Sequence, residues 1–184
     1  MSKPDWMSWV ALSRTHGLGG HGLCHLLRAF GSPEAIYQAS KKQLTEVVSD
    51  AVASQICLGI HQQELTSTQD WLKTSESNQI ITLADDAYPK ALLEIHDPPP
   101  ILYCKGDVGL LNTPCIAVVG SRHATPQGDK NAQDFSETLT LHGFTVVSGL
   151  AQGIDGAAHR GALRGQGKTI AVVGTGLDLS LIHI

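Results

Sequence analysis

Apolar positions in the first part of the chain recur at the three- and four-residue spacing of α-helices. One apolar stripe ends at Phe30, just before a glycine. Ser32 is suited to cap the following helix and Pro33 to begin it, because a serine oxygen accepts from free N–H groups and proline needs no N–H partner at that position. The glycine-rich stretch 17–20 is typical of a loop between two helices. The pattern predicts a small all-helical domain over residues 1–77.

After residue 77 the apolar residues come in short continuous runs, which predict strands near residues 80–83 and 101–104. From Cys115 onward, apolar runs alternate with amphipathic helical periods. These predict strands at 115–119, 144–147 and 169–173, and helices at 126–142 and 153–164. Continuous apolar strands joined by helices form parallel sheets with right-handed crossovers. The fold class is therefore α/β, with an incomplete, three-stranded Rossmann-like parallel sheet in residues 78–184 preceded by the all-helical domain.

Small residues follow all three strands of the predicted parallel sheet: Gly120-Ser121, Ser148-Gly149 and Gly174-Thr175-Gly176. Ligands of open parallel sheets bind at the carboxyl ends of the strands, where glycine allows close approach and helix N-termini favour anions. The hydroxyl groups of this edge add hydrogen-bond donors, and the guanidinium of Arg122 is suited to a phosphate. The sequence therefore predicts a phosphate-binding edge. Neither the dinucleotide pattern GxGxxG nor the P-loop pattern GxxxxGK[ST] is present at the first turn.

Asp155 and His159 lie four positions apart in the second predicted helix of the sheet, and therefore on one helix face. They have two interpretations. The pair is either catalytic, although no serine or cysteine nucleophile can be assigned to it, or it caps and positions the helix. Asp155 also has the alternative of a salt bridge with Arg122.

Charge and composition limit these hypotheses. The chain carries 13 Lys+Arg and 17 Asp+Glu, a formal net charge of -4, so a nucleic-acid site has to be a local patch. The four cysteines show no CxxC spacing and no apolar run reaches membrane-spanning length, which favours a reduced cytoplasmic protein that does not contact a membrane. The nine histidines are scattered, so we expect no metal site and no cofactor.

Three segments together resemble the DprA/Smf family of bacterial DNA-processing proteins. They are AVVGSRHATPQG (117–128), VVSGLAQGIDGAAHRGAL (146–163) and AVVGTGLD (171–178). The segment YPKALLEIHDPPPILYCKGD (88–107) is similar to the stretch that precedes the Rossmann-like core in that family. The helical part resembles, more weakly, the SAM or helix-hairpin-helix-like domain that members carry.

The resemblance implies a protein that binds single-stranded DNA and helps to load the RecA recombinase in natural transformation, without being an enzyme. It also implies that members form homodimers, whose dimer surface and part of whose DNA pocket lie in a half of the domain missing here. Carried over residue by residue, the resemblance places these residues at the DNA: Gly120, Ser121, Arg122, Ser148, Gly149, Gly153, Asp155, Gly174, Thr175 and Gly176, with Lys168 as a further phosphate contact.

Two other functions remain open at this point. One is a Rossmann-like enzyme of the lysine-decarboxylase-like type, which cleaves N-glycosidic bonds of nucleotides, although its PGGxGTxxE motif is not found in this sequence. The other is a regulatory module that binds a mononucleotide.

Overall fold

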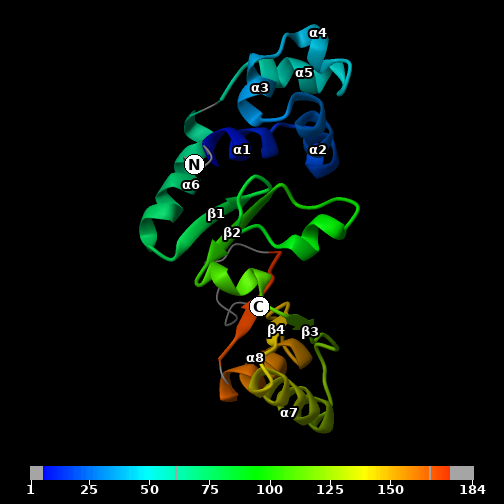
Figure 1. Ribbon diagram of the computed structural model, residues 1–184, viewed down its shortest axis with the longest axis vertical. Helices are drawn as coiled ribbons and strands as arrows, with labels where there is room; N and C mark the ends of the chain where they lie inside the picture. Colours follow the sequence, from blue (N-terminus) through cyan, green and yellow to red (C-terminus); the bar gives the residue numbers. More distant parts are fainter. Residues whose placement is uncertain (1–5, 61, 166, 175–184) are drawn as a thin grey trace. The chain divides into compact units, whose positions relative to one another are not determined.

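A computed structural model describes residues 6–60, 62–165 and 167–174 of the chain. The chain folds as two compact units, Met1–Gly106 and Asp107–Ile184 (Figure 1). Each unit has its own hydrophobic core. No helix of the described residues has the length and apolarity needed to cross a bilayer.

Six helices make up most of the first unit's described part. They are α1 (Trp6–Ser13), α2 (Gly19–Phe30), α3 (Pro33–Gln38), α4 (Lys41–Leu44), α5 (Asp50–Cys57) and α6 (Gln62–Thr74). The cap expected before α3 is confirmed, since the Ser32 hydroxyl accepts from the Ala35 N–H at 3.2 Å. The core of this helical part includes the fully buried side chains of Leu12, Leu23 and Leu26.

An antiparallel pair of strands belongs to the first unit as well. β1 (Asn78–Thr82) pairs with β2 (Ile101–Lys105), and the short 3-10 helix η1 (Lys90–Glu94) lies between them in the chain. Ile80 of β1 packs with Val10, Ala11 and Leu65 from the helices. Because of this shared core, the structure divides the chain at Gly106–Asp107, whereas the sequence placed the boundary at residues 77 and 78.

The second unit contains the predicted parallel sheet, with β3 (Cys115–Ala117), β4 (Thr145–Ser148) and β5 (Thr169–Ala171) in the order β3-β4-β5. The short 3-10 helix η2 (Val108–Asn112) precedes β3. β3 and β5 are shorter than expected. Their hydrogen bonds nevertheless continue for one residue, because the Val118 N–H donates to the Val147 carbonyl and the Val172 N–H to the Ser148 carbonyl, each at 2.9 Å.

Both crossover helices, α7 (Pro126–Leu141) and α8 (Ile154–Arg164), lie on the same side of this sheet (Figure 1). Two successive right-handed crossovers that advance in one direction across a sheet have this result. Val146 is fully buried beneath the helices together with Ala158. Val119 and Val172 are 70% and 64% exposed, so the described residues do not bury both faces of this sheet.

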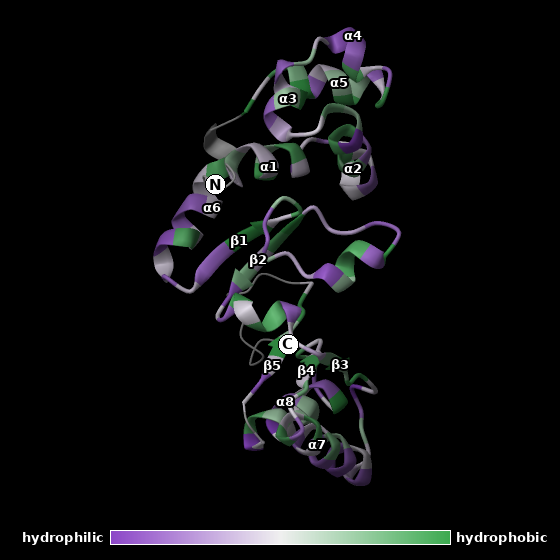
Figure 2. Ribbon diagram, viewed as in Figure 1, coloured by the Kyte–Doolittle hydropathy of each residue, from purple (hydrophilic) through white to green (hydrophobic). Residues whose placement is uncertain are grey.

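The two crossover helices pack with their backbones in close contact. α7 buries the small residues Ala132, Ser136 and Thr140, and a Cβ atom added at Gly161 of α8 would overlap the carbonyl oxygen of Gln133. A Cβ at Gly165 would overlap the Thr140 hydroxyl in the same way. Figure 2 shows hydrophobic and hydrophilic stretches along α7, but the hydrophobic residues are not all on its buried side, because Phe135 and Leu141 are exposed.

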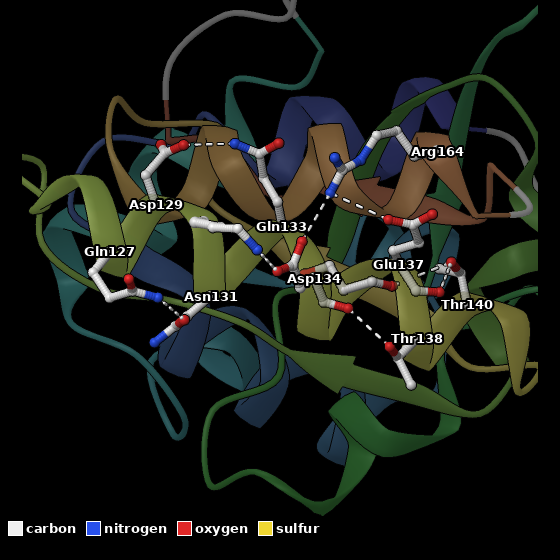
Figure 3. Close-up of polar contacts among 11 residues, drawn as sticks. Gln127, Asp129, Asn131, Gln133, Asp134, Glu137, Thr138, Thr140 and Arg164 are labelled. Carbon is white, nitrogen blue, oxygen red and sulfur yellow. Dashed lines mark hydrogen bonds and ion pairs between the residues drawn. The ribbon is translucent and has the colours of Figure 1, made fainter.

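Ion pairs join α7 and α8 on their outer surface. Arg164 of α8 lies between Asp134 and Glu137 of α7, at 3.4 and 3.2 Å (Figure 3). Arg160 of α8 contacts Asp129 of α7 at 2.9 Å, and within α7 Lys130 donates to Asp134 at 2.6 Å. The hydrogen bond from Lys130 is the main reason that the pKa of Asp134 is lowered. These pairs are exposed, so each adds little stability. They do, however, pair the positive charges of Lys130, Arg160 and Arg164 with carboxylates.

Candidate functional site

The ends of the three parallel strands share one edge of the sheet, as the sequence predicts. Gly120, Gly149 and Gly174 follow the strands at that edge. Gly174 is exposed, and no atom of the described residues lies within 4 Å of the position that its Cβ would take. Thr175 and Gly176 lie outside the described residues.

The turns after β3 and β4 contact each other through their backbones. The Ile154 N–H donates to the Ser121 carbonyl at 3.1 Å. Gly153 has a φ of 78°, and a Cβ added there would overlap the Ser121 carbonyl oxygen and lie 2.7 Å from that of Arg122. Gly153 is therefore required both by its left-handed backbone and by this contact. The result is a single surface formed by two turns that are about thirty residues apart in the chain.

Arg122 is the exposed cation of this surface. It forms no hydrogen bond or ion pair with any described residue, so the salt bridge with Asp155 that we considered is not formed. Ser121 is exposed as well, and its hydroxyl oxygen accepts from the His123 N–H at 3.1 Å, which leaves its O–H free to donate. Both side chains are in position to bind an anion.

Ser148 has a different role from the expected contact with DNA. Its hydroxyl donates to the Val118 carbonyl at 2.6 Å, and the residue is only 3% exposed. The hydroxyl therefore holds β3 and β4 together and does not face a ligand. Leu150, in the same turn, has a φ of 57°, which is unusual for a residue other than glycine. No local sequence pattern predicts this conformation.

Lys168 lies at the other edge of the sheet. It immediately precedes β5, and its carbonyl accepts from the Val146 N–H at 3.1 Å. The amino end of a parallel strand is opposite the edge where the glycine turns lie. Lys168 is therefore not brought together with the other candidate residues.

The helix N-termini offer fewer free donors than the sequence suggests. At the start of α8, the N–H groups of Ile154, Gly156 and Ala157 already donate to backbone carbonyls. At the start of α7, the Thr125 hydroxyl accepts from the Gly128 N–H at 3.1 Å. The anion-binding capacity of this edge therefore depends more on Arg122 and Ser121 than on the helix ends.

Asp155 and His159 are both buried, at 9% and 7% exposure. The Nδ1 of His159 lies 2.7 Å from the Thr169 hydroxyl, which donates to the Val146 carbonyl at 2.9 Å. His159 thus connects α8 to β5 and β4, which favours the positioning interpretation. Burial lowers the pKa of His159, against the opposing influence of the Asp155 charge and the Ser148 backbone.

Because His159 is harder to protonate in the folded chain than in the unfolded chain, we expect the free energy of unfolding to depend on pH. Its pKa in the folded chain is lower than the ordinary value of 6.5, so the unfolded chain binds a proton first as the pH falls. Stability should therefore decrease as the pH is lowered through 6.5 towards the folded-state pKa, and should be fully present above 6.5. Thermal unfolding of the chain and of His159→Gln across this range measures the contribution. An equally steep pH dependence in His159→Gln would show that other groups cause it.

Cysteine and metal chemistry find no support in the described part of the chain. Cys24 is buried, and Cys24, Cys57, Cys104 and Cys115 are all free thiols. Within the described ranges, no group of three or more His, Cys, Asp or Glu side chains is arranged to hold a metal ion.

Comparison with known proteins decides the family. The profile of the DNA recombination-mediator protein A family matches residues 79–181, which is more than half of the chain. The chain belongs to this family. The match includes the whole parallel sheet and both glycine turns described above, so the expected resemblance is confirmed.

Relatives and a solved structure agree with this membership of the DprA/Smf family. The protein Smf of Synechocystis is 35% identical over 97% of this chain and 46% of its own length. The DNA processing protein DprA of Streptococcus pneumoniae is 50% identical over 53% of this chain and 34% of its own length. The crystal structure of the S. pneumoniae protein matches 94% of this chain and 59% of its own, with 32% identity and a TM-score of 0.76. The chain thus spans about half the length of the Smf relative.

Proposed function

We propose that this chain contributes the single-stranded DNA-binding edge of a DNA-processing protein. Family membership supports a role in DNA processing. The observation that carries the proposal is Arg122, an exposed guanidinium without a partner among the described residues, held on a turn whose backbone contacts Gly153. A phosphodiester group is the ligand class that such a fork of donors beside glycine backbone recognises.

Local charge supports the same site in spite of the negative net charge of -4. The three cations on the outer surface of α7 and α8 are already in ion pairs with carboxylates. Arg122, at the strand ends, keeps its positive charge available. The chain therefore directs a polyanion to the edge of the sheet and not to the outer helical surface.

In the longer protein, we infer that this edge holds the strand while it is transferred to the RecA recombinase, as a homodimer in the cytoplasm and without catalysis by this chain. The engagement of His159 with Thr169 supports binding over catalysis, because it uses the imidazole to hold α8. Retention of RecA on the immobilised longer protein, with and without DNA, tests the partner.

Salt dependence tests the phosphate contact. Arg122→Ala is expected to weaken binding to all single-stranded sequences alike and to flatten the log–log slope of affinity against salt by about 0.7, the value for one phosphate contact on a single strand. Filter binding or fluorescence anisotropy across a salt series measures both quantities.

Lys168→Ala is the matched control, since it removes one positive charge from the opposite edge of the sheet. It should leave the salt slope unchanged. If Arg122→Ala lowers the melting temperature but leaves the salt slope unchanged, Arg122 stabilises the fold and the proposed phosphate contact is wrong.

A further inference from the structure

A buried carboxylate lies at the edge where we place the phosphate. Asp155 is in the first turn of α8, and one of its carboxylate oxygens, Oδ2, lies 2.8 Å from the position that a Cβ of Gly149 would take. The same Cβ position lies 3.9 Å from the Val172 carbonyl oxygen. Asp155 therefore occupies the space left by the missing side chain of Gly149, between the ends of β4 and β5.

In the part of the chain that the structure describes, the charge of Asp155 acts on His159, but its carboxylate has no hydrogen-bonded partner. It forms no hydrogen bond or ion pair there, although it is only 9% exposed. Its oxygens are not among the fully enclosed side-chain atoms without a partner, which in the described part of the chain are Asn78 Oδ1, Ser136 Oγ and His159 Nε2. A carboxylate that is mostly buried and accepts no hydrogen bond from the described residues is unfavourable unless a donor meets it.

A phosphate is not that donor, since it is itself an anion. We propose that Asp155 accepts a hydrogen bond from the exocyclic amino group of a base in the bound strand. This inference rests on the proposed function. It divides the edge into two parts, with Arg122 for the phosphate and Asp155 for the base. Carboxylates accept from the N4 amino group of cytosine in this way, whereas thymine has a carbonyl oxygen at the same place.

The two parts are joined through Gly153. The position of its Cβ lies 2.7 Å from the Arg122 carbonyl oxygen, and Asp155 follows two residues later in the chain. A nucleotide whose phosphate binds at the turn after β3 can therefore direct its base towards the end of β4. Thr175 and Gly176 are not needed for this argument.

The experiment compares single strands of deoxycytidine and of deoxythymidine of equal length, at neutral pH, with the whole chain. The chain is expected to bind the cytosine strand at least about fivefold more tightly. In Asp155→Asn the preference should fall to within about twofold, because an amide also donates to the thymine carbonyl.

Asp134→Asn is the matched control, because it removes the same charge from the outer surface of α7 (Figure 3). It should keep the preference for cytosine. Equal binding of both strands by the unchanged chain, or a preference that survives in Asp155→Asn, would overturn the inference and leave the proposed function standing. If neither strand binds, the proposed function fails together with the inference. The comparison of the two strands on the unchanged chain does not depend on the folding of any variant.

Discussion

Gly161→Ala is expected to destabilise the Asp107–Ile184 unit by about 3 kcal/mol or more. The added methyl group would overlap the Gln133 carbonyl oxygen, which is part of the α7 backbone and cannot turn away as a side chain does. α7 and α8 would have to separate, and that would open the packing of Ala158 on Val146. Alanine's better helix propensity, worth up to about 1 kcal/mol, is too small to compensate.

Two spectroscopic signals separate the units in this experiment. All three tryptophans, Trp6, Trp9 and Trp71, lie in the first unit, so their fluorescence follows only that unit, whereas far-ultraviolet circular dichroism follows both. In urea, Gly161→Ala should lower the dichroism midpoint and leave the fluorescence midpoint in place. Gly20→Ala in α2, where the nearest atom is 3.6 Å from the Cβ position, is the control and should be neutral or slightly stabilising. Equal dichroism curves for Gly161→Ala and the unchanged chain would contradict the close packing.

Much of the fold follows from local sequence. The apolar runs that become β3, β4 and β5 alternate with amphipathic helical periods and so predict a parallel sheet, because continuously apolar strands joined by helices are typical of such sheets. The Ser32 cap is equally local, since the side chain and the N–H that it accepts from are three residues apart. Features of this kind depend on neighbours in the chain, which a single sequence displays directly.

The domain boundary depends on distant contacts. The residues around Ile80 predict a strand, but they do not predict that Ile80 packs against Val10 and Leu65. For that reason the sequence joined the first two strands to the Rossmann-like part, whereas the structure groups them with the helices. The hydrogen bond from the Ser148 hydroxyl to the Val118 carbonyl joins residues thirty positions apart, so local sequence does not predict it either.

The position of Lys168 could have been predicted. A residue just before a parallel strand lies at the amino edge, and the ligands of such sheets bind at the carboxyl edge. The resemblance favoured Lys168 because of its charge, whereas the topology separates it from Arg122. The topology also explains why the remaining candidates gather in the two turns that contact each other at Gly153.

Gly153→Ala is expected to weaken single-stranded DNA binding by about tenfold or more and to lower the stability of the second unit by about 1–3 kcal/mol. Two causes act together. The φ of 78° strains any residue with a Cβ, and that Cβ would overlap the Ser121 carbonyl oxygen. The turn that carries Arg122 must therefore move away from α8, and a displaced guanidinium no longer binds the phosphate at the strand ends.

Gly174→Ala provides the control for Gly153→Ala. It adds the same methyl group at the same edge of the sheet, but no atom in the described part of the chain lies within 4 Å of its Cβ position, so the melting temperature should stay unchanged. Anisotropy titrations with single-stranded DNA, together with thermal unfolding, measure both effects. If Gly153→Ala keeps the affinity and the salt slope of the unchanged chain while its stability falls, the turn after β3 is not where the strand binds. A DNA contact at Arg122 would then be excluded, because no substitution moves that turn more directly.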